Sequence, residues 1–207
     1  MKLTWLGHAC FLVEQDGYSV VFDPYAPGFV PGLPPLSVTA DRVICSHGHD
    51  DHNYAEAVTC RTGGQADPFR VTAIPTWHDE KQGALRGPNT IHVLEAGGVR
   101  IAHFGDIGCP LTPEQVRTLG RLDAALFPVG GYFTLGPEQA KTELDKLDVG
   151  LILPMHYRGK DFGFPVLATV EEFTALYDTT PVQTVDSSSV TVSPGEEKRV
   201  LLLRCTK

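Results

Sequence analysis

Apolar and polar positions along the first quarter of the chain follow the pattern of β-strands. Aromatic and β-branched residues are concentrated in short runs, and turn residues such as Asp16 and Gly17 separate them. The strand-like runs are KLTWL (2–6), CFLVE (10–14), SVVFD (19–23) and RVIC (42–45). We therefore expect this region to form a sheet.

The rest of the chain alternates strand-like runs with helical segments. Strands are predicted at 69–74, 90–95, 99–104, 124–129 and 150–155, and again near 182–186 and 199–204. Helices are predicted at 54–58 and 137–147, after the capping sequence at 112–115, and after the capping box at 169–172. With no low-complexity segment or linker, the pattern predicts one domain, 1–207, of mixed α/β class with two sheets flanked by helices.

Residues 24–36, PYAPGFVPGLPPL, interrupt this pattern. Five prolines and two glycines exclude a helix or a central strand. We expect an ordered loop carrying Phe29, Leu33 and Leu36. It either packs on the core as a rim or closes over a functional site, because long loops without secondary structure are often functional.

Composition and charge exclude several function classes. The formal net charge of -8 argues against nucleic acid as a partner, since phosphate binding favours a basic surface. No apolar run approaches the ~20 residues of a membrane span, and the N-terminal segment lacks the features of a signal peptide. Five scattered cysteines without a CxxC pair indicate free thiols in a reducing cytoplasm.

The segment SHGHDDH (46–52) contains three of the 8 histidines of the chain. Residues two apart in an extended segment point the same way, so His47 and His49 can reach one ion together. Asp51 and His52 follow and can face a second ion. The loop alone supplies too few ligands. Further candidates, each just after a predicted strand, are His78, Asp106 and His156, while His92 and His103 compete with His78 from within predicted strands.

Several motifs resemble those of one family. HGHDDH fits the HxHxDH signature of the metallo-β-lactamase superfamily. A wider set resembles small bacterial and archaeal metal-dependent hydrolases related to L-ascorbate-6-phosphate lactonase: WLGHACFLVE, VVFDPY, SHGHDDH, RGPN, HFGDIG, PVGG and PMHY. The resemblance runs from residue 3 to about residue 160, and no motif of the tail after 165 contributes to it.

The resemblance implies an αββα sandwich with a dinuclear site at one edge. It assigns His47, His49 and His78 to the first metal, Asp51, His52 and His156 to the second, and Asp106 to both. The expected cofactors are two divalent ions, Zn²⁺ first, with Mn²⁺, Fe²⁺ and Ni²⁺ as alternatives.

The activity that follows is hydrolysis of a small, anionic or neutral substrate. A hydroxide bridging the ions would attack an ester, lactone or phosphoester bond, with Asp51 or Asp106 as proton acceptor. A non-hydrolytic sensor or di-iron redox protein is the alternative. The sequence does not decide whether the protein forms a homo-oligomer.

Weaker candidates surround this set. His8, Asp23 and His103 could orient metal ligands or serve only the core. Four polar residues flank the ligand loops and could bind an anionic group of the substrate or remain solvated: Arg86, Asn89, Arg158 and Lys160.

Overall fold

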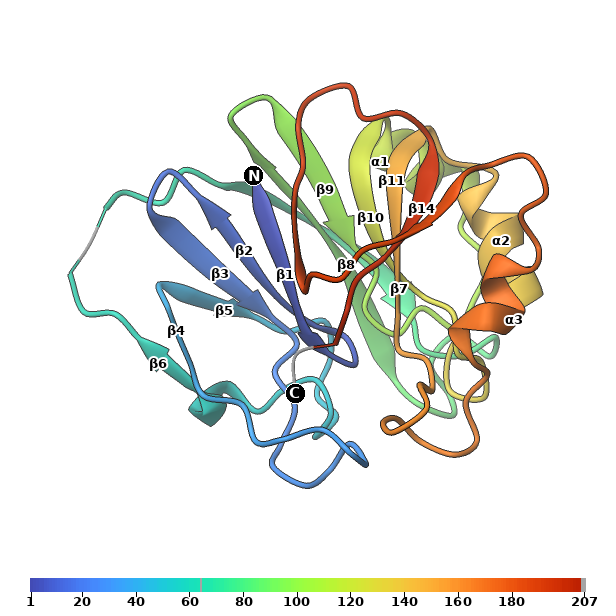
Figure 1. Ribbon diagram of the computed structural model, residues 1–207, viewed down its shortest axis with the longest axis horizontal. Helices are drawn as coiled ribbons and strands as arrows, with labels where there is room; N and C mark the ends of the chain where they lie inside the picture. The colour runs from blue at the N-terminus through green and yellow to red at the C-terminus, as the bar shows by residue number, and fades with distance from the viewer. Residues whose placement is uncertain (64, 206–207) are drawn as a thin grey trace.

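Two β-sheets face each other in the computed structural model, which describes residues 1–63 and 65–205 (Figure 1). The first sheet has the strand order β13-β1-β2-β3-β5. Its strands are β1 (Lys2–Gly7), β2 (Cys10–Gln15), β3 (Tyr18–Phe22), β5 (Arg42–Ile44) and β13 (Ser189–Thr191). The pairs β1–β2 and β2–β3 are antiparallel, whereas β3 and β5 are parallel.

The second sheet is larger and has the order β12-β14-β11-β10-β9-β8-β7. Its strands are β7 (Arg70–Trp77), β8 (Pro88–Ala96), β9 (Val99–His103), β10 (Leu122–Pro128), β11 (Val149–Met155), β12 (Val182–Thr184) and β14 (Arg199–Leu202). The pairs β7–β8 and β8–β9 are antiparallel, whereas β9, β10, β11, β14 and β12 pair in parallel in that order.

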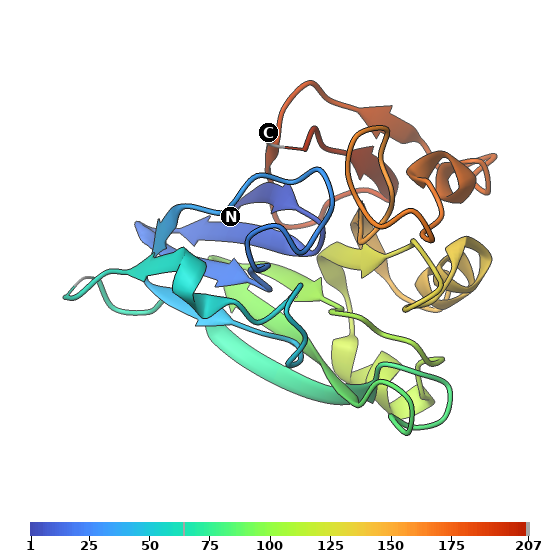
Figure 2. The ribbon, with the colours of Figure 1, turned by 90° about the horizontal axis from the view of Figure 1, so that it is seen from below.

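Helices cover the outer face of the second sheet, as the view from below shows (Figure 2). They are α1 (Pro113–Leu119), α2 (Pro137–Leu144) and α3 (Val170–Thr174). α1 begins at the predicted capping box: the Thr112 hydroxyl accepts from Gln115 N, and the Gln115 side chain accepts from Thr112 N. Strands β10 and β11 are buried at every position because they lie between these helices and the first sheet.

Alternation along β2 and β3 divides the core in two. Phe11 and Phe22 point between the sheets, into the main hydrophobic cluster. Cys10 and Val21 point to the other face, into a smaller cluster with Tyr25, Val30, Leu33, Ala40 and Val58. That outer face is covered by the loop 24–36 and by β4 (Val38–Ala40) and β6 (Val58–Cys60), which follows the 3₁₀ turn η1 (Ala55–Ala57). The layers follow the expected αββα order, with this first outer layer reduced to short elements.

Some predicted element boundaries were wrong. The segment 54–58 forms only a 3₁₀ turn, and the helices after residues 136 and 169 end at Leu144 and Thr174. The pattern did not reveal β4, β6 or β13, because three-residue strands form through pairing with distant partners, such as β13 with β1.

Strand direction brings the polar motifs together. β1, β3 and β5 end at one edge of the first sheet, and β7, β9 and β11 end at one edge of the second. A backbone hydrogen bond from His156 N to His8 O (3.2 Å) joins the ends of β11 and β1, and one from Thr90 N to Ser46 O (3.0 Å) joins the sheets nearby. The residues that follow six strands therefore meet in one place.

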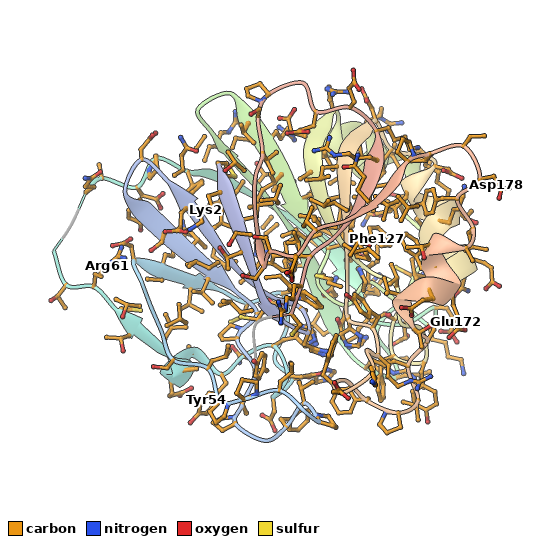
Figure 3. The ribbon with its side chains drawn as sticks, viewed as in Figure 1. Lys2, Tyr54, Arg61, Phe127, Glu172 and Asp178 are labelled. Carbon is orange, nitrogen blue, oxygen red and sulfur yellow. The ribbon has the colours of Figure 1, made fainter. Side chains whose placement is uncertain are left out.

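In Figure 3, Tyr54 marks this lower end of the molecule, while Glu172 and Asp178 lie at the helical side. Tyr54 N donates to Pro24 O (2.8 Å), and Ala26 N donates to Asp50 O (2.8 Å). The loop 24–36 is thus attached to the histidine loop. No helix of the described residues is long and apolar enough to cross a membrane.

Candidate metal centre

Three imidazoles form a first group of candidate ligands. His47 and His49 come from the loop after β5, and His78 follows β7. One nitrogen of each lies within 4.8 Å of the nitrogens of the other two. The ring centroid of His47 lies 4.7 Å from those of both His49 and His78. His49 is exposed, His47 is half-buried and His78 is buried, so the group opens to one side.

A second group is buried and contains Asp51, His52 and His156, together with His8. His8 Nε2 lies 3.2 Å from Asp51 Oδ2, within hydrogen-bond distance. The His8 and His156 ring centroids lie 4.1 Å apart. His8 follows β1 with a left-handed backbone (φ 51°), which turns its ring toward the group.

Asp106 lies between the two groups. Its Oδ1 is 3.2 Å from His52 Nε2, and its Oδ2 is 3.3 Å from His78 Nε2 and 3.1 Å from His156 Nε2. One carboxylate therefore faces histidines of both groups, which is the placement expected of a shared ligand.

Buried polar atoms without hydrogen-bond partners test whether these residues fit a metal. Within the described residues, His47 Nε2, His52 Nε2, His156 Nε2 and Asp106 Oδ1 are all buried and form no hydrogen bond of good geometry, although Asp106 lies 3.1–3.2 Å from the Nε2 atoms of His52 and His156. Unsatisfied buried atoms are rare and costly in folded proteins. A cation bound to nitrogen and carboxylate oxygen would satisfy them together, and the donor set suits a first-row divalent ion.

The electrostatics of the groups point the same way. Burial, reinforced by His52, lowers the pKa of His47 to about 3. Burial, reinforced by His156, lowers the pKa of His8 to about 4. Both imidazoles are therefore neutral at neutral pH, which is the form that binds metal.

His52 differs from these two histidines. Burial by itself lowers its pKa, but Asp106 and Asp23 outweigh burial and hold the pKa well above its ordinary value. Burial likewise would raise the pKa of Asp106, but His156 and His52 hold it well below its usual range. The carboxylates of Asp106 and Asp23 therefore favour a positive charge at the position of His52.

Asp23 and Ser46 hold the histidine loop from behind. Asp23 accepts from His52 Nδ1 (2.8 Å), Ser46 N (2.7 Å) and Ser46 Oγ (2.5 Å). Ser46 Oγ also lies 2.9 Å from His47 Nδ1. The carboxylate of Asp23 thus fixes the His52 ring with Nε2 toward Asp106, as buried partners of metal ligands commonly do.

The two remaining histidines, His92 and His103, lie outside both groups of candidate ligands. His103 Nε2 donates to Ala9 O (2.8 Å), and Gly105 N donates to His103 Nδ1 (3.1 Å), so both ring nitrogens are occupied and the ring is neutral. His92 pairs with His103 across β8 and β9. Neither belongs to the two groups, and His78, which competed with them, is the histidine that does.

The supporting roles of two residues, Asn89 and Asp79, were not recognised from the sequence. Asn89 Oδ1 accepts from Asp106 N (2.9 Å) and its amide donates to Phe104 O (2.9 Å), so this residue holds the Asp106 turn rather than a substrate anion. Asp79 accepts from the backbone nitrogens of four residues of the loop that follows it: Lys81, Gly83, Leu85 and Arg86. The only signal for Asp79 was its position beside His78.

Asp79 makes the loop after β7 rigid. Burial would raise the pKa of Asp79, but the four backbone amides outweigh it and hold the pKa below its ordinary value. His78 N donates to Gly87 O (3.1 Å), so the loop closes on itself. His78 and Arg86 are therefore held in one fixed unit.

A pocket of about 430 Å³ opens beside the groups. It is lined by four of the candidate ligands, His49, Asp51, His78 and Asp106, and also by Phe29, Gly48, Asp50, Arg86, Phe133 and Phe164. Its volume lies in the range of small-molecule sites. Of the loop 24–36, Phe29 lines the pocket, whereas Leu33 is buried in the smaller core cluster.

Comparison with known proteins supports a hydrolase family. Residues 2–156 match the family described as Beta-lactamase superfamily domain. The chain is 32% identical to a UPF0173 metal-dependent hydrolase of Methanoculleus marisnigri, over 97% of both chains. It is 30% identical to one of Carboxydothermus hydrogenoformans, over 84% of this chain and 90% of the relative.

Solved structures of similar proteins support the same family and fold. A protein of Thermotoga maritima, named as a Zn-dependent hydrolase of the metallo-beta-lactamase superfamily, is 34% identical, with a TM-score of 0.74 over 97% of both chains. A metallo hydrolase of Ignicoccus hospitalis, 22% identical with a TM-score of 0.62 over 84% of this chain and 89% of the other, shares the fold. The protein therefore belongs to the metallo-β-lactamase superfamily and, within it, to the UPF0173 metal-dependent hydrolases.

Proposed function

We propose that this protein is a dinuclear metal hydrolase that cleaves an ester, lactone or phosphoester bond of a small molecule. The observation that carries the proposal is the position of Asp106, whose carboxylate oxygens lie 3.1–3.3 Å from histidine nitrogens of both groups, with His52 Nε2, His156 Nε2 and Asp106 Oδ1 buried and in no hydrogen bond of good geometry among the described residues. Zn²⁺ is the proposed metal, because the donors are imidazoles and carboxylates.

The proposed ligands follow from the two groups. His47, His49 and His78 would hold one ion, and Asp51, His52 and His156 the other, with Asp106 shared. When bound, two divalent ions acidify a water as nucleophile and place positive charge opposite the developing oxyanion.

The protein's own residues contribute orientation and proton transfer. Asp23 fixes the His52 ring and Asn89 fixes the Asp106 backbone. Asp51 lines the pocket and accepts a hydrogen bond from His8, so its carboxylate is positioned to take up the proton released in the reaction.

Substitution of Asp106 tests the proposal. The wild-type protein loaded with Zn²⁺ should contain two ions per chain by elemental analysis and should hydrolyse at least one class in a panel of esters, lactones and phosphodiesters. Asp106→Ala should lose both the ion pair and the activity, because its carboxylate serves both groups. His92→Ala, which removes a histidine outside the groups, is the control. Full activity and two ions in Asp106→Ala would refute the assignment.

A further inference from the structure

Three phenylalanines from three separate loops line the pocket and form what we call its aromatic wall. Phe29 comes from the loop 24–36, Phe133 follows β10 and Phe164 follows β11. The ring centroid of Phe164 lies 6.1 Å from that of Phe29 and 5.9 Å from that of Phe133, both edge-on. Phe29 is 42% exposed and Phe133 and Phe164 are half-buried, with Phe164 packed against the smaller core cluster, so the rings are accessible from the pocket.

Arg86 stands beside this wall and is the one lysine or arginine among the described residues that line the pocket. Its guanidinium carbon lies 5.9 Å from the Phe133 ring centroid, and its Nη2 donates to Tyr132 O (3.1 Å). These contacts hold the head group in place while Nε and Nη1 make no hydrogen bond within the described part of the chain.

Arg86 also forms no ion pair with a carboxylate of the described residues. Seven arginines form ion pairs with carboxylates: Arg42, Arg61, Arg70, Arg100, Arg121, Arg199 and Arg204. Among the described residues no carboxylate pairs with Arg86, although acidic side chains line the same pocket. An unpaired, preorganised guanidinium in a pocket is suited to bind a carboxylate or phosphoryl group.

The other proposed anion ligands do not reach the pocket. Asn89 is committed to the Asp106 turn. Arg158 Nε donates to Leu167 O (3.1 Å), and neither Arg158 nor Lys160 lines the pocket. Arg86 is moreover held by Asp79 in the same rigid loop as His78, so an anion bound there stays at a fixed position relative to the candidate metal ligands.

We infer that the substrate carries an aromatic or similarly flat apolar group, which packs on Phe29, Phe133 and Phe164, and an oxyanion group, which binds Arg86. The inference rests on the proposed function, because it treats this pocket as the substrate pocket. Apolar walls with a few placed polar groups are typical of small-molecule sites, where the polar groups fix orientation.

Equilibrium binding to the Zn²⁺-loaded protein tests the inference without turnover. Three probes separate the contributions: 3-phenylpropanoate carries both groups, 3-phenylpropan-1-ol only the ring, and butanoate only the anion. Isothermal titration should show 3-phenylpropanoate binding roughly tenfold or more tightly than either of the others. Equal affinity for 3-phenylpropanoate and butanoate would overturn the aromatic part.

Variants then assign the contacts. Arg86→Gln should reduce the affinity for 3-phenylpropanoate to that for the alcohol, and Phe133→Leu should weaken binding of both aromatic probes. Arg70→Gln, an exposed charge loss at the start of β7, should change neither. Unchanged 3-phenylpropanoate affinity in Arg86→Gln would show that the carboxylate binds elsewhere, including at the metals, and would overturn the inference.

Failure of this inference is distinguishable from failure of the proposed function. Two bound ions and hydrolysis, without the probe selectivity, would reject the substrate class and leave the hydrolase. Probe selectivity in a protein that takes up no metal and hydrolyses nothing would reject the hydrolase.

Discussion

At the scale of single residues, Asp23 shows how a side chain outside the pocket can control the centre. It is fully buried, with a left-handed backbone (φ 44°), directly after β3. Its two oxygens receive three hydrogen bonds from Ser46 and His52. An asparagine has one acceptor oxygen in place of two, so it cannot hold both residues as the carboxylate does.

Asp23→Asn should therefore weaken Zn²⁺ binding by about 10–100-fold, because the His52 ring loses its orienting carboxylate. Competition titration against a chromophoric chelator measures this affinity. The matched control is Asp41→Asn, since Asp41 likewise accepts hydrogen bonds from the backbone and side chain of a buried serine, Ser19, and pairs with Arg61, but lies outside the centre. Equal affinities in the two variants would contradict the orienting role of Asp23.

At the scale of elements, the loop 24–36 has two functions within thirteen residues. Phe29 belongs to the pocket wall and Leu33 to the core cluster outside the first sheet. Leu33 is held tightly, because Gly32 lies against Asp161 and Gly163 N donates to Pro31 O (2.8 Å). Of the two alternatives expected for this loop, contact with a site describes Phe29 and packing on the core describes Leu33.

Single serine substitutions should separate these functions. Phe29→Ser should raise KM several-fold with metals still bound, because it removes pocket surface and no ligand. Leu33→Ser should instead lower the free energy of unfolding by about 2–4 kcal/mol, since it leaves a cavity and buries a hydroxyl. Steady-state kinetics and chemical denaturation check the two effects. A change of KM in Leu33→Ser but not in Phe29→Ser would contradict the assignment of Phe29 to the pocket and of Leu33 to the core.

Strand β8 contains a half-buried histidine remote from the pocket. Burial, reinforced by His103, lowers the pKa of His92 to about 4, against an opposing contribution from Asp23. Between pH 6.5 and pH 4, the unfolded chain binds a proton at His92 that the folded chain does not bind. The stabilising effect of a neutral His92 is therefore present above pH 6.5 and is lost as pH falls.

His92→Gln should reduce the loss of unfolding free energy between pH 7 and pH 5 by about 1–2 kcal/mol, because glutamine does not titrate. Denaturant unfolding of metal-free wild-type and variant proteins at both pH values measures the difference. The same pH dependence in both proteins would show that His92 titrates normally in the fold.

At the scale of the whole molecule, the candidate centre lies where the two sheets meet. His8, Asp51 and His52 follow strands of the first sheet, while Asp106 and His156 follow strands of the second. Bound ions would link the two sheets, and a ligand that binds only the folded state stabilises it by mass action.

Removal of metal should therefore lower the thermal unfolding midpoint. For free metal about 100-fold above Kd, the stabilisation is about 2.7 kcal/mol, which corresponds to roughly 5–10 °C for a chain of this size. Differential scanning calorimetry with and without EDTA measures the shift. Asp106→Ala should show no shift on EDTA addition, and a wild-type midpoint insensitive to EDTA would contradict a metal link between the sheets.

The sequence by itself determined most of the strands, the caps of α1 and α3, and the identity of the polar residues that follow the strands. Local patterns carry this information: alternation of apolar residues predicts β2 and β3, and Thr112 with Gln115 predicts the start of α1. The HxHxDH motif is likewise local, so the histidine loop and its family were predictable from the residues alone.

Only the tertiary structure decided how those residues meet. Strand order and direction place His8 against Asp51, Asn89 against Asp106, and Arg86 against Phe133, although each pair is distant in sequence. No periodicity encodes such contacts, because they depend on which strands pair and on how two sheets stack. The side chains that position the candidate ligands, and those that form the pocket, were therefore identified by the fold.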